Sequence, residues 1–262
     1  MKVTGHVVLA SIVAALLAVV RVDAVIFGQP DGNGHPYVGL IVFDVDGVPS
    51  HRCSGTLISR SVVLTAAHCT SGTSAARVWF DSSVTDPAYP FGGGTSHSGT
   101  PFTHPEFNFA TFPNTHDVGV VVLHQPVEMS TYGRLPVVGA LDALGTMRGV
   151  QNEFFRIVGY GLQAVVPSLM ANRTRYFGVP QLVELNSALT GGFNIHLSGN
   201  NGNRAPGGAC FGDSGGPAFY PNTSNIVAGV GSFVLNGNCV GAGFYYRVDK
   251  SDAQDFIGQF LR

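Results

Sequence analysis

The stretch GDSGGP, residues 212–217, uses three glycines and a proline to present one aspartate and one serine. A serine hydroxyl is a poor nucleophile unless a base accepts its proton and donors stabilise the oxyanion that forms. Glycine, aspartate and serine are also the ordinary residues of tight turns, so this stretch by itself predicts only a turn. A chemical role for Ser214 therefore requires partners elsewhere in the chain.

Two other segments supply side chains of the right kind. LTAAHC, residues 64–69, ends a strand-like run at His68, where two alanines leave room around an imidazole. In HDVGVVVL, residues 116–123, Asp117 stands directly before a continuous apolar strand, an unusual place for a charge unless a partner hydrogen-bonds it. Taken alone, Asp117 also fits a strand cap, and the neighbouring His116 is interpreted as a bystander.

The composition indicates a mostly β fold. The chain has 35 glycines and 15 prolines, and strand-like runs recur between turn signals. These runs are YVGLIVF, RVWF, VGVVVL, FFRIVGYG and NIVAGVGSFVL. Near the end of the chain, apolar residues from Ala253 to Leu261 recur at helical spacing, with Ser251 or Asp252 as the expected cap. The sequence therefore predicts β-strands followed by one short terminal helix.

Charge and metal motifs exclude other classes of protein. Charged residues make up 11% of the chain and the net charge is −2, without a basic run, so nucleic acid is not an expected partner. The chain has no His-Glu-x-x-His motif, and DVDG, residues 44–47, reads as a hairpin turn rather than a calcium loop. We therefore expect no metal site and no cofactor.

The four cysteines predict disulfides. An even cysteine count in an exported chain favours disulfides over metal or redox roles, although four cysteines allow three connectivities. A bridge between Cys53 and Cys69 would join two adjacent strands beside His68, and a bridge between Cys210 and Cys239 would tie the serine loop to a neighbouring loop. Their positions favour this pairing, and each closure contributes about 3 kcal/mol.

The first 24 residues have the pattern of a signal peptide. A basic start precedes the apolar run from Val7 to Val20, and VDA follows with the small-residue spacing of a cleavage site after Ala24. The apolar run is shorter than the roughly 18 residues that span a bilayer, which argues against the alternative of a membrane anchor. The sequence therefore predicts a secreted, extracellular protein whose mature domain covers residues 25–262.

In their order His, Asp, Ser, the three motifs resemble the signature segments of the trypsin-like (chymotrypsin-fold) serine proteases. CSGTLIS at residues 53–59 and GSF at residues 231–233 extend the resemblance over nearly the whole mature chain. The family implies an all-β fold of two packed six-stranded antiparallel β-barrels with a short C-terminal helix. It also implies a serine endopeptidase in which Ser214 attacks the peptide carbonyl, His68 transfers the proton and Asp117 orients His68.

The resemblance also assigns the surroundings of Ser214. The N–H groups of Gly212 and Ser214 would form the oxyanion hole, and the hydroxyl of Ser232 would steady Asp117. Gly208 falls at the pocket base, where trypsins carry an aspartate. Val234 and Gly243 fall on the pocket walls, where valine narrows the entrance as in elastase-like members. These positions imply cleavage after small or medium apolar residues rather than after arginine or lysine.

Activation departs from the family pattern. Family members are usually cut to free an N-terminus reading like IVGG, whose ammonium pairs with the aspartate before the nucleophile. The matching segment here is VIFG, residues 25–28, with neither arginine nor lysine before it. We therefore expect signal cleavage itself to free the ammonium of Val25, which would pair with Asp213. A cut elsewhere or a further trimming step is the alternative.

Two other functions compete with this interpretation. The first is a catalytically inactive binding protein of the same fold, which usually lacks a member of the triad. The second is an α/β-hydrolase esterase, in which the histidine would follow the serine in the chain. The expected partners are protein or peptide substrates and proteinaceous inhibitors, and the enzyme is expected to be a monomer that leaves the membrane after signal cleavage. Asn172 and Asn222 lie in N-x-S/T sequons and are candidate glycosylation sites.

Overall fold

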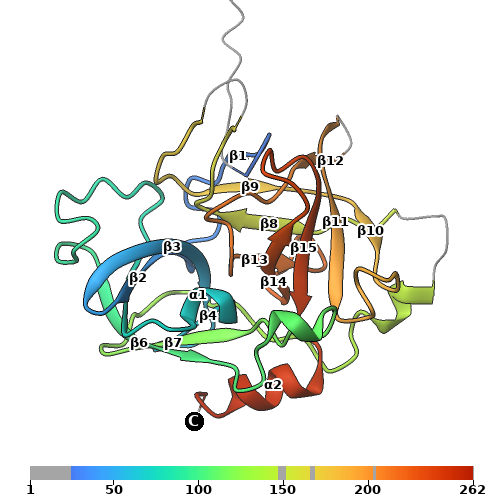
Figure 1. Ribbon diagram of the computed structural model, residues 1–262. Coiled ribbons are helices and arrows are strands. Elements are labelled where there is room, and N and C mark those ends of the chain that lie inside the picture. The colour runs from blue at the N-terminus through green and yellow to red at the C-terminus, as the bar shows by residue number, and fades with distance from the viewer. Residues whose placement is uncertain (1–24, 147–151, 166–168, 203–204, 262) are drawn as a thin grey trace, which may run out of the picture.

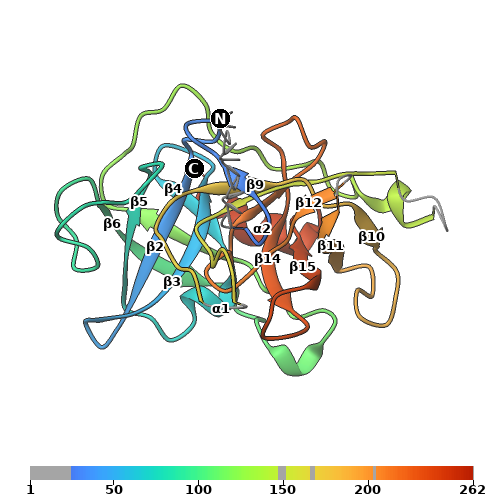
Figure 2. The same cartoon turned by 90° about the horizontal axis from the view of Figure 1, so that it is seen from above.

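The computed structural model describes residues 25–146, 152–165, 169–202 and 205–261, and the predicted signal peptide lies outside them. The described chain is mostly β, as the sequence predicts, and it forms two β units that stand side by side (Figures 1 and 2). None of its helices has the length and apolar character that a membrane crossing needs.

The first unit is a closed barrel of six strands in the order β2-β3-β4-β7-β6-β5, which confirms the first predicted barrel. Its strands are β2 (Val38–Val45), β3 (Val48–Leu57), β4 (Val62–Thr65), β5 (Ala75–Trp79), β6 (His97–Thr103) and β7 (Gly119–Leu123). Asp46 and Gly47 connect β2 to β3 with φ angles of 51° and 79°, the positive values of a two-residue hairpin turn. The predicted turn at DVDG is therefore confirmed.

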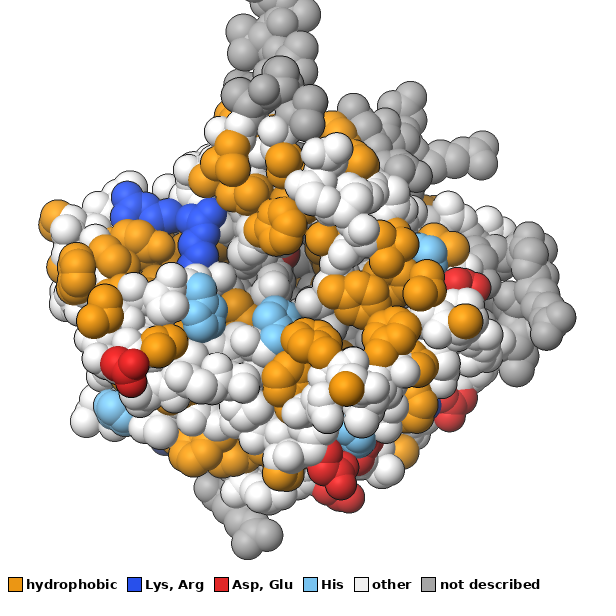
Figure 3. Space-filling view, in the orientation of Figure 1, with side chains coloured by type: hydrophobic (Ala, Val, Ile, Leu, Met, Phe, Trp, Pro, Cys, Tyr) orange, Lys and Arg blue, Asp and Glu red, His pale blue; other side chains and the backbone are white. Residues whose placement is uncertain are grey.

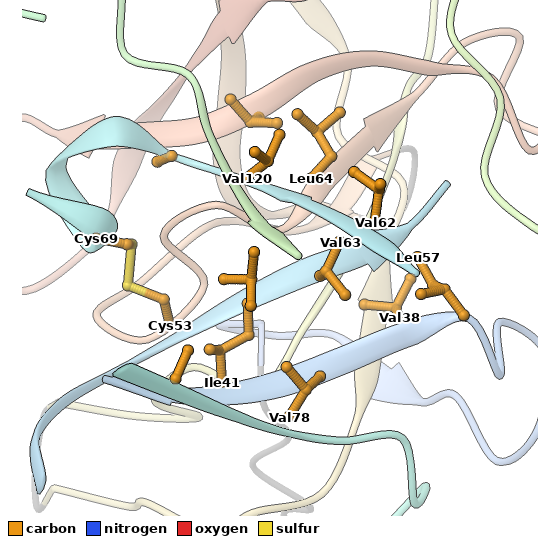
Figure 4. Close-up of a cluster of buried hydrophobic side chains, with 14 of the residues drawn as sticks. Val38, Ile41, Cys53, Leu57, Val62, Val63, Leu64, Cys69, Val78 and Val120 are labelled. Atoms are coloured by element: carbon orange, nitrogen blue, oxygen red, sulfur yellow. A yellow bond between two sulfur atoms is a disulfide. The ribbon is translucent and has the colours of Figure 1, made fainter. Parts of the chain in front are cut away.

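Aliphatic side chains from all sides fill this barrel (Figure 4). Ile41 of β2, Val63 of β4 and Val78 of β5 are fully buried, and complete burial of each such side chain is worth about 1.5–3 kcal/mol. The disulfide between Cys53 and Cys69 lies at one end of the same cluster. The core and the disulfide thus fix the segment that carries His68.

The second unit is one sheet of nine strands, a larger count than the six predicted. Its strands are β1 (Gln29–Pro30), β8 (Arg156–Gly159), β9 (Tyr176–Gly178), β10 (Leu182–Glu184), β11 (Asn194–Gly202), β12 (Ala205–Gly207), β13 (Pro217–Phe219), β14 (Val227–Val234) and β15 (Gly241–Arg247). Six of them form the continuous path β9-β8-β13-β14-β15-β11. The additional strands arise because β1 pairs with β9 while β10 and β12 pair with β11, and β12 lies beside β9.

Helical structure is short. It comprises α1 (Ala67–Thr70), η1 (Phe109–Thr111), η2 (Asp142–Thr146) and α2 (Ser251–Gly258). Helix α2 confirms the predicted terminal helix, and it buries Phe256 and Ile257 against the first unit. The expected cap is wrong, because Ser251 and Asp252 lie inside the helix and Lys250 is the N-cap, without a side-chain hydrogen bond.

A buried arginine joins the N-terminal segment to both units. The guanidinium of Arg175 bonds to Asp31 at 2.8 Å, to the Val38 carbonyl of the first barrel at 3.0 Å and to the Tyr160 hydroxyl of the second unit at 3.1 Å. Burial raises the pKa of Asp31, but His35 and Arg175 outweigh it and bring that pKa down to about 2. The segment that follows Val25 is therefore anchored by charge at the boundary between the units.

Candidate functional site

The structure brings His68 and Asp117 together at the edge of the first barrel. His68 belongs to α1, which follows β4, and Asp117 lies two residues before β7, the neighbour of β4 in the barrel. The carboxylate of Asp117 is completely buried and accepts the His68 backbone N–H at 2.9 Å. It also contacts His68 Nδ1 at 2.8 Å and accepts the Ser232 hydroxyl at 2.6 Å. Three contacts thus fix the orientation of the imidazole, including the contact to Ser232 that the resemblance implied.

Ser214 and His68 line one cavity of about 330 Å³ between the two units. Figure 3 shows this face of the molecule hollowed near its centre, with histidine side chains at the hollow. His68 Nε2 lies 3.6 Å from the sulfur of Cys69. Among the contacts of the described residues there is no hydrogen bond between the Ser214 hydroxyl and His68.

Gly212 and Gly215 of the GDSGGP stretch are required to be glycine for different structural reasons. Gly212 has φ +98°, a conformation that side chains rarely adopt, and its carbonyl accepts the Ser54 hydroxyl at 2.9 Å. A Cβ on Gly215 would come within 2.0 Å of the Thr65 hydroxyl, so only glycine fits there. Within the described residues, the N–H groups of Gly212 and Ser214 donate to no backbone acceptor. Both amides are therefore free to bind an anionic oxygen.

The rest of the cavity lining is apolar and comes mainly from the second unit. It consists of Ala209, Cys210, Phe211, Phe233, Val234 and Phe244 beside the smaller or polar residues around Ser214. Phe233 and Phe244 stack with their ring centres 4.4 Å apart, and the ring of His196 also stacks with that of Phe244, at 4.5 Å. The sequence interpretation did not identify this aromatic wall, because it forms only where β11, β14 and β15 lie side by side.

The three predicted pocket residues take different places. Val234 lines the cavity, as predicted. Gly243 pairs with Val234 across β14 and β15, and a Cβ on it would lie 3.3 Å from that of Ala209. Gly208 lies behind the lining, where a Cβ would come within 2.6 Å of the Gly199 backbone. The lining residue next to Gly208 in the chain is Ala209, so this part of the cavity carries no charge.

Asp213 is buried next to Ser214 and holds its carboxylate on backbone donors. It accepts the N–H of Gly161 at 2.8 Å and that of Cys210 at 3.0 Å. Burial raises the pKa of Asp213 to about 7, although these hydrogen bonds and the charge of Arg52 oppose the shift. None of the ion pairs found between described residues includes Asp213.

The segment around Val25 lies close to the chain that leads to Asp213. Val25 is 1% exposed, and the carbonyl of Ile26 accepts the N–H of Gly208 at 2.9 Å. The disulfide between Cys210 and Cys239 packs in a small cluster with Ile26. Both predicted disulfides are thus present, and the second one holds the loop that carries Asp213 and Ser214.

Two groups of side chains among the described residues have the composition of a metal site, but in one of them, Cys53, His68 and Cys69, the two cysteines form a disulfide. Atoms of His104, His116 and Asp252 that could bind an ion lie within 4.8 Å of one another. His104 Nδ1 already accepts the N–H of Glu106 at 3.2 Å, and His116 Nδ1 lies 2.8 Å from Asp252. These contacts tie the segment before Asp117 to helix α2, so His116 has a structural role rather than that of a bystander.

Comparisons with known proteins agree with this geometry. The family model described as Trypsin matches residues 27–257. Chymotrypsin-like elastase family member 1 of Canis lupus familiaris is 29% identical over 211 residues, which cover 72% of each chain. A structure described as HL collagenase has a TM-score of 0.70 at 22% identity and covers 90% of this chain and 98% of its own. That of scabies mite inactivated protease paralogue S-D1 has a TM-score of 0.68 at 17% identity and covers 90% and 99%. The two structural likenesses establish the fold.

Proposed function

The chain belongs to the trypsin family, and on that basis we propose that it is a secreted serine endopeptidase with a triad of Ser214, His68 and Asp117. The observation that carries this proposal is the hydrogen bonding of Asp117, which is buried, contacts His68 twice and accepts Ser232. Burial of a carboxylate costs free energy unless hydrogen bonds compensate for the lost hydration. Here the partner of the carboxylate is a histidine that lines the same cavity as Ser214.

Each residue has a defined task in the proposed reaction. Ser214 Oγ bonds to the carbonyl carbon of the peptide while His68 Nε2 takes the hydroxyl proton. The negative carbonyl oxygen then accepts the free N–H groups of Gly212 and Ser214, a stabilisation of about 3 kcal/mol per donor. The C–N bond breaks as His68 returns the proton to the leaving amine. Water repeats the cycle on the acyl-enzyme and releases the acid.

The cavity favours small or medium apolar side chains before the cleaved bond. Its lining is mostly apolar and includes Val234, which narrows it. Among the described lining residues Asp213 is the one carboxylate, and it is buried and accepts the backbone N–H groups of Gly161 and Cys210. An arginine or lysine would therefore enter without a partner for its charge. The similarity to an elastase is consistent with this preference.

Secretion and activation form the second part of the proposal. Residues 1–24 act as the signal peptide, and cleavage after Ala24 frees the ammonium of Val25. A buried carboxylate without a cation, beside a buried Val25 segment, is the environment that such an ammonium would complete. Two disulfides suit an extracellular protein. The mature domain of residues 25–262 would act as a monomer on protein or peptide substrates and be open to proteinaceous inhibitors.

An inactive binding protein of the same fold is the alternative, and one of the similar structures is of an inactivated paralogue. The intact set of His68, Asp117 and Ser214 favours the enzyme. Secreted mature protein should cleave a peptide library, with alanine, valine or leucine preferred before the cut. The Ser214→Ala variant should fold equally well and lose activity by several orders of magnitude. Turnover above a few per cent of wild type in that variant would refute the triad. A preference for arginine before the cut would refute the proposed specificity for small or medium apolar residues.

A further inference from the structure

An unpaired cation lies against the candidate oxyanion hole. Arg52 is in β3 directly before Cys53, and its Nε is 3.4 Å from the position that a Cβ on Gly212 would take. Its Nη1 makes one long hydrogen bond of 3.4 Å to the Asn172 carbonyl. No ion pair between described residues includes Arg52, and its charge acts on the buried Asp213. A half-buried guanidinium therefore retains unused donors beside Gly212.

Arg52 also lines a second cavity, of about 340 Å³, on the side of the first barrel. Its lining consists of Val42, Pro49, Ser50, His51, Arg52, Tyr89 and Pro90. The guanidinium of Arg173 stacks over the Tyr89 ring at 4.5 Å, which brings a second positive charge to its rim. Figure 3 shows Lys and Arg side chains gathered on one flank of the central hollow.

The carboxylates around this second cavity are already engaged. Asp44 of β2 pairs with Arg77. Asp86 accepts the Trp79 indole N–H at 3.2 Å and the Ala88 N–H at 2.9 Å. Among the described lining residues, Arg52 is the one with a permanent charge. The cavity therefore favours an anionic ligand.

The two cavities share no lining residue, and Gly212 lies next to a residue of each: Phe211 and Asp213 line the first, and Arg52, beside Gly212, lines the second. The apolar cavity, on the side of β14, receives the side chain before the cleaved bond in the proposed function. The residues after the cleaved bond of a peptide whose carbonyl oxygen binds the amides of Gly212 and Ser214 would then lie within reach of Arg52, because Arg52 is the cation beside Gly212.

We propose that Arg52 and the second cavity form a subsite that selects glutamate or aspartate within the first three residues after the cleaved bond. This inference rests on the proposed function. A guanidinium offers paired N–H donors that match a carboxylate, and its position in a partly closed cavity strengthens such a contact relative to open solvent.

Matched fluorogenic peptides test the subsite. Each would carry alanine or valine before the cleaved bond and either glutamate or glutamine at the first, second or third position after it. In wild type, kcat/KM should favour glutamate by about five- to tenfold at one of these positions. Arg52→Gln should bring that ratio to about one, and Arg52→Glu should favour lysine over glutamine at the same position. Arg60→Gln is the matched control, because Arg60 pairs with Glu128 on an exposed surface. In this variant the ratio of kcat/KM for glutamate over glutamine should equal that of wild type.

The outcomes separate the two proposals. Cleavage without a preference for glutamate, or a preference that survives in Arg52→Gln, would overturn the subsite and leave the endopeptidase standing. A wild-type protein that cleaves none of the peptides, including the neutral ones, would overturn the endopeptidase and the subsite with it.

Discussion

Two buried aspartates lie next to the proposed catalytic residues, and they differ in the groups that stabilise their carboxylates. Asp117 accepts the backbone and the ring of His68 and the hydroxyl of Ser232. Asp213 accepts two backbone N–H groups, and its pKa is raised to about 7 by burial. All the partners of Asp117 are side chains or backbone already in place, whereas Asp213 is buried without a cation.

This difference distinguishes two parts of the site. The contacts of Asp117 form when the chain folds, whereas the ion pair proposed for Asp213 needs cleavage after Ala24. The pair of His68 and Asp117 needs only the first barrel and β14. Asp213 forms no ion pair among the described residues, although the charge of Arg52 acts on it, and the nearby segment from Val25 can supply a cation after cleavage. The base should therefore be in place in the folded uncut chain, and the oxyanion hole should be fully ordered only after cleavage.

The largest effect on activity is expected from a change at Asp117, whose partners are all in place in the folded chain. Asp117→Asn keeps the size of the side chain but no longer selects the tautomer of His68 that can accept the Ser214 proton. The value of kcat should fall by about ten thousandfold with little change in thermal stability, as measured with a peptide substrate and by calorimetry. A loss of less than tenfold would show that Asp117 does not orient the base.

The next effect concerns the stability of the uncut form. The folded-state pKa of Asp213, about 7, lies above the ordinary value of 3.8, so the folded chain binds a proton that the unfolded chain has lost. The stability from this group is present below about pH 4 and is lost as pH rises through about 7. Over that range a form that keeps Ala24 should lose about 4 kcal/mol of stability, roughly a thousandfold in its folding equilibrium, whereas the mature form, in which the ammonium pairs with Asp213, should not show this loss.

Denaturant unfolding of both forms at several pH values measures this loss. Asp213→Asn in the uncut form is the matched control, because it removes the titrating group and should remove the difference. Parallel pH profiles for the cut and uncut forms would contradict a pairing between the Val25 ammonium and Asp213.

Activity of the uncut form gives a smaller effect. One extra residue displaces the ammonium from Asp213, so the loop with Gly212 should be less well ordered and kcat/KM should fall by about a hundredfold, comparable with the loss of one oxyanion donor. Val25→Ile, which leaves the ammonium in place, is the control and should stay near wild type. Undiminished activity with Ala24 retained would remove the ion pair from the mechanism.

The smallest effect returns to Asp117. Ser232→Ala removes one of its three contacts and leaves both contacts to His68, so kcat should fall by about tenfold. Comparison with Asp117→Asn in the same assay sharpens the ranking of the contacts. A loss in Ser232→Ala as large as that in Asp117→Asn would mean that Ser232, rather than the carboxylate, determines the orientation of His68.

Local motifs were sufficient to predict much of the site. The segments around His68, Asp117 and Ser214 carry short-range signals, and the structure brings their residues together across the two units. Both disulfides and the hairpin turn at Asp46 followed from spacing and turn chemistry in the same way.

Long-range packing supplied the rest, and the sequence could not show it. The six strands expected for the second unit came from the family resemblance, and strands β1, β10 and β12 have only two or three residues each, too few for a periodic pattern that would have added them. The approach of Arg52 to Gly212 and the stack of Phe233 on Phe244 depend on how distant segments meet. Such contacts leave no mark in the local sequence.

The central claim is that Ser214 is an activated nucleophile, and covalent labelling tests it most directly. The mature secreted protein, its N-terminus checked by sequencing, is treated with a diphenyl phosphonate that carries a valine-like side chain, and the labelled peptide is identified by mass spectrometry. Stoichiometric labelling of Ser214, abolished in Ser214→Ala and strongly slowed in Asp117→Asn, is the predicted result. A folded protein that begins at Val25 and never reacts would contradict the account and identify it as an inactive relative.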